Sequence, residues 1–474
     1  MADQPNVLFL MTDHNNSLAM APGSQCIKPN LDALAAEGVR FDRFYTTNAI
    51  CSPARASLMT GVYASTHGMW DVTHGQRPEW LDVPASRFTY FSMNLAEAGY
   101  RNAYFGKWHV EQSNKLEQFG WHEYDVECGR MLGPDRRIRH VESSAVAVPK
   151  EGYRDHLLSG VGDGIDDITH PAFDKGIDFI RNHAESDRSD QPFFCFVSVV
   201  EPHDPYIPPK RFFDMYDLDK VELSPTLRVE PDGKPDIVKR MRSVWDDVTD
   251  DDWRRVTASY WAVLSYIDSE VGRIIDILKE TGQYDNTIIV FTSDHGDMMG
   301  GHGLVTKGIG TPYEEVYKIP LIIRTPKTAS GREDTATVTS MVDLAPTLLD
   351  MCGAEPIEAA QGRSLRPVIE GTADPGEWRH AYAEFYGQRF VYTQRIVWDG
   401  DWKYVFSPGG IDELYNLGND PHELKNLADD PAHREKLVDM TKRMWRKMKE
   451  IGDDSLFNSQ YATLRTAPVG PEDI

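Results

Sequence analysis

Short, unbroken runs of apolar residues recur along the first 360 residues of the chain. Such runs, bounded by turn-forming residues, predict buried strands, and they fall at residues 6–11, 101–105, 193–200, 287–292 and 319–324. Between them, apolar residues follow helical spacing, most clearly over residues 254–280. A shorter helix is expected from Pro29 to a stop at Gly38. Buried strands that alternate with helices predict an α/β fold with a large, mostly parallel sheet sandwiched by helices.

The pattern changes near residue 375. Short strands without intervening helices, as in an antiparallel sheet, are expected at residues 381–386, 390–398, 403–406 and 413–416. A helix at about 432–450 and a polar tail follow. Because 474 residues exceed what one hydrophobic core usually supports, we expect two domains. The larger spans residues 1–370, and a smaller C-terminal α+β domain built on an antiparallel sheet and a helix spans 371–474.

Acidic and imidazole side chains follow two of the predicted strands, as Asp13-His14 and Asp294-His295. Ligands of open α/β sheets bind beyond the carboxyl ends of the strands. Two carboxylates brought together there would repel each other without a cation between them, and oxygen ligands suit Ca²⁺ or Mg²⁺. The alternative is that each aspartate merely caps a helix. Imidazole suits Zn²⁺ better than Ca²⁺. His14 therefore either changes which metal is expected, or it hydrogen-bonds to a metal ligand without binding the metal itself.

The segment Cys51-Ser-Pro-Ala-Arg55 precedes a helix expected to start near Pro53. Cys51 could be a buried, inert thiol. It cannot be the thiolate of a protein tyrosine phosphatase, because the Cys-x₅-Arg spacing of that class would require arginine where Ser57 stands. Arg55 lies one helical turn after Cys51 and therefore faces the same side.

Five motifs in a fixed order carry a resemblance to a known family. They are Thr12-Asp13-His14, the Cys51–Arg55 segment, Gly106-Lys107-Trp108-His109, Glu201-Pro-His-Asp-Pro-Tyr206 and Ser293-Asp-His-Gly296. With these motifs the chain resembles, over nearly all of its length, the type I, formylglycine-dependent sulfatases of the alkaline-phosphatase-like superfamily. The resemblance implies that residues 1–370 form the catalytic domain. It also implies that a maturation enzyme oxidises Cys51 to formylglycine, whose hydrate attacks sulfur.

The resemblance further implies the site residues. The implied catalytic residues are Cys51, Arg55, Lys107, His109, His203 and Lys307. The implied ligands of one divalent ion are Asp13, His14, Asp294, His295 and Cys51. That ion would be Ca²⁺ in the first place, with Mn²⁺ or Mg²⁺ as alternatives.

Individual roles follow from the same resemblance. Arg55 would orient the nucleophile and Lys107 would bind a sulfate oxygen. His109 would take a proton from the remaining hydroxyl, which is general-base work suited to imidazole. His203 and Lys307 would donate to the bridging oxygen. In an extended segment, Lys107 and His109 would point to the same side.

The expected activity is hydrolysis of sulfate monoesters, either aryl or small alkyl and sugar sulfates. A phosphonate monoester or phosphodiester hydrolase using the same site, with promiscuity for both, is the main alternative. A third candidate is a sulfated-glycan binding protein that has lost activity, but the implied nucleophile and both lysines are present. Trp70, His74 and Arg77, in the loop over residues 66–77, either line the substrate pocket or belong to an ordinary surface loop.

The net charge and the number and spacing of the cysteines limit which partners and which cellular compartment are expected. The chain carries 50 basic and 74 acidic residues, a net charge of −24, which argues against nucleic acid or an anionic membrane. No 18-residue apolar run predicts a membrane span, and the start lacks the pattern of a signal peptide. Five cysteines without a C-x-x-C pair fit the cytoplasm. The expected partners are a small anionic sulfate ester, the maturation enzyme and, through the charged tail, a second copy of the chain.

Overall fold

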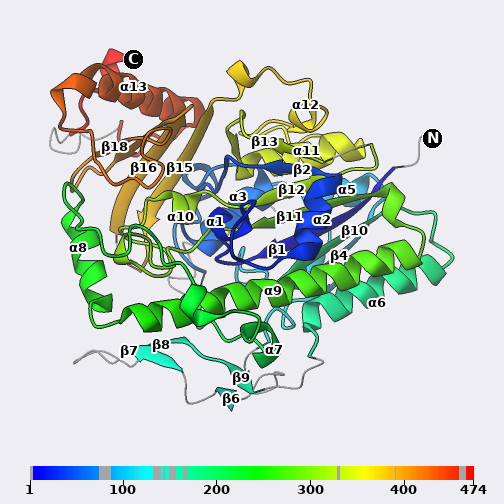
Figure 1. The fold of residues 1–474 in the computed structure, drawn as a ribbon. Helices are drawn as coiled ribbons and strands as arrows, with labels where there is room; N and C mark the ends of the chain where they lie inside the picture. Colours follow the sequence, from blue (N-terminus) through cyan, green and yellow to red (C-terminus); the bar gives the residue numbers. More distant parts are fainter. Residues whose placement is uncertain are drawn as a thin grey trace.

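The computed structural model describes residues 4–73, 87–113, 115–131, 140–141, 145–148, 156–163, 168–327, 331–389, 391–457 and 466–474. At its centre lies an eight-stranded sheet with the order β13-β2-β12-β11-β1-β10-β4-β5 (Figure 1). Its strands are β1 (Asn6–Thr12), β2 (Val39–Phe41), β4 (Arg101–Gly106), β5 (Glu123–Asp125), β10 (Phe193–Ser198), β11 (Thr287–Ser293), β12 (Leu321–Arg324) and β13 (Arg332–Asp334). The predicted large sheet of buried apolar strands is therefore confirmed.

The sheet is mostly parallel, as predicted, with one strand reversed. β1 runs parallel to both β10 and β11, whereas β12 runs antiparallel to β11 and to β2. The connection from β11 to β12 contains only one short α-helix, α10 (Glu314–Tyr317), and no crossover helix. A strand that returns without a crossover pairs antiparallel to the one before it, which explains the direction of β12.

Helices cover both faces of this sheet. On one face, α2 (Pro29–Glu37), α6 (Pro171–Glu185) and α9 (Asp250–Glu280) share a core with the side chains of Leu8 and Leu10; α6 and α9 run side by side (Figure 1). On the other face, α3 (Cys51–Thr60), α5 (Phe91–Glu97) and α11 (Leu344–Cys352) pack with Val7 and Phe9. Because alternate residues of β1 enter opposite cores, all five residues between Asn6 and Thr12 are apolar.

The long helix α9 begins four residues before the predicted start at residue 254. Thr249 caps it: its hydroxyl accepts from the Asp252 amide, and the Asp252 carboxylate accepts from the Thr249 amide. This reciprocal pair satisfies two amides that the first turn leaves unpaired. The apolar pattern marked the packed face and not this polar first turn.

The C-terminal elements match the prediction closely. β15 (His380–Gly387), β16 (Val391–Asp399), β17 (Trp402–Phe406) and β18 (Glu413–Asn416) form an antiparallel sheet, and α13 (Arg434–Ile451) packs on it (Figure 1). The other face of this sheet shares a core with the larger part of the chain, in which the rings of Tyr45 and Trp398 lie 4.4 Å apart. The domain boundary at residue 370 stays a prediction.

The remaining elements are short. The helices are α1 (Ser17–Met20), α4 (Ala64–His67), α7 (Lys210–Phe213), α8 (Asp236–Arg242) and α12 (Arg366–Ile369). The strands are β3 (Phe44–Tyr45), β14 (Thr339–Ser340), β6 (His140–Val141), β7 (Val146–Val148), β8 (His156–Ser159) and β9 (Gly162–Asp163). β6 to β9 lie beyond α9, on the far side from the central sheet (Figure 1). Among the described helices, none is both long and apolar enough to cross a membrane.

Candidate active site

The carboxyl edge of the central sheet brings the two Asp-His motifs together. β1 and β11 are parallel neighbours with Thr12 opposite Ser293, so the next residues, Asp13 and Asp294, emerge side by side. Both are completely buried. Burial opposes ionisation of Asp13, but Lys107 and His203 outweigh it and hold the pKa of that carboxyl well below its usual range. Asp13 is therefore a buried carboxylate.

Cys51 is the first residue of α3, which begins two residues earlier than expected. Its Sγ lies 3.1 Å from Nε2 of His295 and 3.6 Å from Oδ1 of Asp13. The ligand atoms of Asp13, Cys51, Asp294 and His295 all lie within 4.8 Å of one another. Four potential metal-ligand atoms thus meet at the N-terminus of a helix, the end that attracts negative charge.

Arg55 is held rigidly beside this group. Its Nε donates to Oδ2 of Asp294 at 2.7 Å, and Nη1 donates to Ser198 Oγ and to the Lys107 carbonyl, both at 2.8 Å. Its side chain is 1% exposed. This fixed, buried guanidinium faces the side of α3 that carries Cys51, as the one-turn spacing predicted.

Lys107 and His109 both reach the group, but not through the extended segment that we expected. His109 has a φ of 54°, in the left-handed region. The chain turns because it leaves β4 through Gly106, itself at a φ of 106° and closely packed against the Ser198 carbonyl. Lys107 Nζ pairs with the Asp13 carboxylate. Burial and Lys107 together lower the pKa of His109 to about 4, partly offset by a hydrogen bond with Cys51.

The electrostatics of Cys51 follow from these neighbours. Burial and the Asp13 carboxylate oppose its thiolate, whereas Lys107, Lys307 and His295 favour it, and the pKa of the thiol falls well below its usual range. His295 donates from Nδ1 to the Gly296 carbonyl at 2.9 Å. Its other ring nitrogen, Nε2, therefore faces Cys51 and Asp13, and Asp294 and Cys51 raise the pKa of the imidazole against the effect of burial.

His14 lies next to this group and not within it. Its Nε2 accepts a hydrogen bond from Lys307 Nζ, and its Nδ1 donates to Oδ2 of Asp297 at 2.6 Å. His203 Nε2 lies 3.2 Å from the same Lys307 ammonium, and the His14 and His203 rings are 4.0 Å apart. Lys307 thus contacts two of the histidines predicted to belong to the site. The role of His14 as a metal ligand stays a prediction.

Asp297 is a site residue that the sequence reasoning missed. Besides His14, it accepts from the Tyr206 hydroxyl at 2.7 Å and from the amides of Met299 and Thr306, both at 3.0 Å. Burial raises the pKa of Asp297 to about 6 against these donors. The available signal was a second carboxylate three residues after Asp294, in Asp294-His-Gly-Asp297.

The loop predicted to line the pocket is described in part. Trp70 is 47% exposed and stacks on Tyr386 of β15, with ring centroids 5.3 Å apart, whereas His74 and Arg77 lie outside the described residues. The strands of the hairpin between β15 and β16 were predicted, but not that its turn reaches the site. There Gln388 presents its side-chain oxygen to Gly308, the residue after Lys307.

Known proteins provide an independent comparison. The sequence matches the sulfatase family over residues 5–354, and the family described as N-sulphoglucosamine sulphohydrolase, C-terminal, over residues 300–450. The choline-sulfatase of Rhizobium meliloti (strain 1021) is 32% identical over 457 residues, covering 90% of this chain and 83% of that protein.

Two solved structures share the fold. Phosphonate monoester hydrolase of Agrobacterium radiobacter superposes with a TM-score of 0.75 at 25% identity, covering 94% of this chain and 96% of that chain. A protein solved with its substrate D-glucosamine-2-N,6-O-disulfate gives a TM-score of 0.76 at 23% identity, covering 96% and 100%. The match over most of the sequence confirms the predicted resemblance: the chain belongs to the sulfatase family of sulfuric ester hydrolases.

Proposed function

We propose that the chain hydrolyses sulfate monoesters at the group of side chains around Cys51, after oxidation of Cys51 to formylglycine. The observation that carries the proposal is the position of Cys51 Sγ. It sits at a helix N-terminus within 4.8 Å of three other potential donors, and Lys107, Lys307 and His295 supply positive charge around it. An oxyanion substrate needs such preorganised positive charge, which an overall charge of −24 does not provide.

A single divalent ion fits the donor set. Asp13, Asp294 and His295 offer carboxylate oxygens and an imidazole nitrogen, Nε2, that faces the group and would lose any proton on binding the ion. Oxidation of Cys51 would replace its sulfur by oxygen, giving a mostly oxygen set that suits Ca²⁺, with Mn²⁺ or Mg²⁺ as alternatives. Arg55 fixes Oδ2 of Asp294, and Oδ1 accepts from the His295 amide at 2.9 Å, which leaves it a second lone pair for a metal ion.

The hydrated formylglycine would supply the attacking hydroxyl and later release sulfate by re-forming the aldehyde. Arg55, Lys107 and Lys307 would hold the sulfate group. His109, which contacts Cys51, is positioned to take a proton from the second hydroxyl. His203 and Lys307, 3.2 Å apart, are placed to donate to the leaving oxygen together.

Hydrolysis of phosphonate monoesters is the second candidate. Similarity to the Agrobacterium radiobacter phosphonate monoester hydrolase favours it. A phosphonate monoester and a sulfate monoester are both singly charged tetrahedral anions, so the same cations would bind either. We further propose a reducing, cytoplasmic setting, in keeping with five free cysteines, together with activation by a maturation enzyme and self-association through the C-terminal tail.

The test compares matched aryl esters on protein co-expressed with a formylglycine-generating enzyme. Mass spectrometry of the peptide that contains Cys51 reports the oxidation. We expect kcat/KM for the aryl sulfate to exceed that for the aryl phosphonate, and Cys51→Ala to abolish both while leaving the circular dichroism spectrum unchanged. Full activity of Cys51→Ala would refute the mechanism, and preference for the phosphonate would assign the second candidate.

A further inference from the structure

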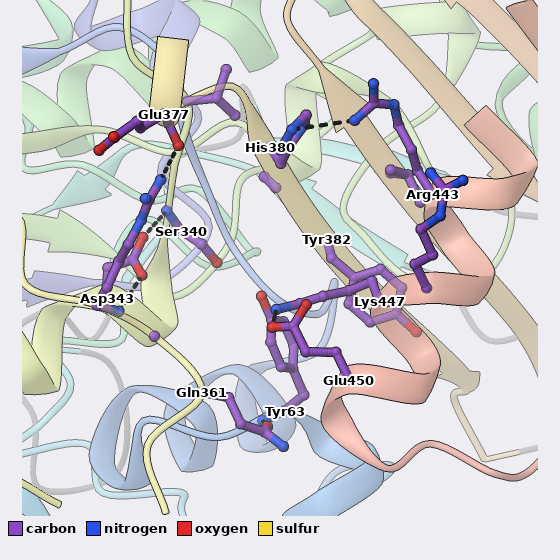
Figure 2. A pocket seen from close by; sticks show the side chains of 16 residues that line it. Tyr63, Ser340, Asp343, Gln361, Glu377, His380, Tyr382, Arg443, Lys447 and Glu450 are labelled. Atoms are coloured by element: carbon purple, nitrogen blue, oxygen red, sulfur yellow. Dashed lines mark hydrogen bonds and ion pairs between the residues drawn. The ribbon is translucent and has the colours of Figure 1, made fainter. Parts of the chain in front are cut away.

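A cavity of about 500 Å³ lies far from Cys51, between the larger part of the chain and the C-terminal helix (Figure 2). Tyr63, just beyond the C-terminal end of α3, contributes one wall; residues around β14 and the segment 361–363 add a second wall, and β15 and α13 close it. Its lining shares no residue with the group around Cys51. Since Cys51 begins the ten-residue helix α3, the two sites stand roughly 15 Å apart along that helix alone.

Positive charge gathers on the wall formed by α13. Arg443, Arg446 and Lys447 have helical spacing that places them on one face, and Arg363 contributes a fourth cation from the opposite wall. Arg443 and Lys447 are paired with Asp399 at 3.1 Å and with Glu450 at 2.8 Å. Within the described part of the chain, no carboxylate lies at ion-pair distance from Arg446 or Arg363. Arg446 thus lacks a paired carboxylate, whereas Arg363 donates to the Glu377 carbonyl at 2.6 Å and stacks on the ring of Trp378.

The opposite wall offers buried hydrogen-bonding groups. Ser340 is 4% exposed, and its side chain accepts from the Asp343 amide at the start of a short 3₁₀ helix, Met341–Asp343. Its neighbour Asp343 accepts from the Ser340 amide at 2.8 Å and from the Arg363 amide at 2.9 Å. Figure 2 shows Ser340 and Asp343 facing Arg443 and Lys447 across the cavity. Each oxygen of Asp343 accepts from one backbone amide, so the carboxylate keeps acceptor capacity on this wall.

Apolar and aromatic groups complete the lining. The rings of Tyr63 and Tyr382 meet edge to face with centroids 5.3 Å apart, next to the apolar side chains of Val338 and Val397. An aromatic surface, a few convergent polar groups and a volume between roughly 300 and 1,000 Å³ characterise small-molecule sites. The volume exceeds what a bare oxyanion would fill, so the ligand must carry further atoms.

We propose that this cavity binds a sugar-sized polyol bearing one tetrahedral oxyanion group, a sugar sulfate or a sugar phosphate. The oxyanion lies against Arg446, Arg443 and Lys447, the hydroxyls bond to Asp343, and the ring packs on Tyr63. Tyr63 lies three residues after the end of α3, so the ligand contacts the short connection between α3, which begins with Cys51, and α4.

Calorimetry on the full chain tests the proposal, with glucose 6-sulfate and glucose 6-phosphate as probes. A Cys51→Ala background prevents turnover, and any binding near Cys51 is common to all variants. We expect Arg446→Glu to weaken the cavity isotherm at least tenfold, whereas Lys449→Glu leaves it unchanged. Lys449 is the matched control, because it is exposed on the same helix and does not line the cavity. The tighter of the two probes identifies the oxyanion.

Crystals soaked in selenate, an anomalously scattering isostere of sulfate, locate the anion directly. An anomalous peak beside Arg446, Arg443 and Lys447, lost in Arg446→Glu, supports the proposal. Selenate at Cys51 alone, equal isotherms for the Arg446→Glu and Lys449→Glu variants, or no binding of either sugar beyond the component near Cys51 overturns it. Melting temperatures of both variants close to that of the parent show that the exposed substitutions leave the fold intact.

Discussion

The substitution Asp297→Asn isolates the residue that connects the histidines of the site. It replaces one carboxylate oxygen by an amide that can donate but not accept. Oδ2 of Asp297 now accepts from His14 Nδ1 at 2.6 Å and from the Tyr206 hydroxyl at 2.7 Å, while Oδ1 accepts from two backbone amides. The two amides fix which oxygen is retained, so the new amide group faces His14 and Tyr206.

The magnitude follows from the bonds lost. A hydrogen bond to a charged group contributes about 1.5–3 kcal/mol, so losing two would cost about 3–6 kcal/mol of unfolding free energy. The Tyr206 hydroxyl can rotate to accept from the new amide, and removal of a buried charge offsets part of the rest. We therefore expect a net loss of about 2–4 kcal/mol. His14 can also accept only by moving its proton to Nε2, where it would face the Lys307 ammonium.

That change of tautomer predicts a functional loss beyond the stability loss. Loss of a hydrogen-bond partner that orients a metal-site histidine typically lowers activity or metal affinity roughly 10–100-fold. We expect kcat/KM for an aryl sulfate to fall by that factor in Asp297→Asn at a temperature where the variant is folded. Tyr206→Phe, which removes the hydroxyl and leaves His14 paired, should retain most of the activity. The exposed Asp285→Asn is the control for the chemical change alone.

Equal losses in Tyr206→Phe and Asp297→Asn would refute the reasoning, because they would trace the effect to Tyr206 and not to the His14 tautomer. So would an Asp297→Asn variant with unchanged kcat/KM. Urea unfolding at matched pH gives the stability term, and kcat/KM measured across metal concentrations separates weaker metal binding from slower chemistry.

Three further predictions concern charge. Lys403→Met leaves the buried carboxylates of Glu314 and Glu423, now 3.1 and 2.7 Å from its ammonium, without a counter-charge. It should lower the free energy of unfolding in urea by about 3–5 kcal/mol. Burial raises the pKa of Glu423 to about 8 despite Lys403, so its stabilising contribution is complete below its unfolded pKa and is lost as pH rises toward 8; the deficit of the variant should therefore be smaller at pH 5.5 than at pH 8. In Arg55→Lys the lysine cannot reproduce the three hydrogen bonds of the guanidinium, so kcat/KM should fall by roughly 100-fold. An unchanged kcat/KM would contradict the role of Arg55 in the active site. A chelator should abolish turnover, and the ion among Ca²⁺, Mn²⁺ and Mg²⁺ that restores it fully identifies the metal; activity that survives chelation and dialysis contradicts a metal requirement.

Sequence reasoning succeeded where the chain itself fixes the geometry. The apolar runs fixed the strands, and neighbouring parallel strands place the residues that follow them at one edge, as with Asp13 and Asp294. The one-turn spacing placed Arg55 beside Cys51. The direction of β12 escaped prediction because it depends on the path of the preceding loop, which carries no periodic signal.

The conformations at the site could not be predicted for a physical reason. Among the residues that the structure describes, seven other than glycine have positive φ, including His14, His109, Met299 and Thr306 in the loops at the carboxyl edge of the sheet. Such conformations cost of order 1–3 kcal/mol each and persist only where surrounding structure imposes them. Asp297 is that structure for three of the four, because its carboxylate accepts from the His14 ring and from the amides of Met299 and Thr306. A local sequence pattern cannot reveal a conformation that a distant carboxylate enforces, so the residue that shapes the site was also the one that sequence reasoning missed.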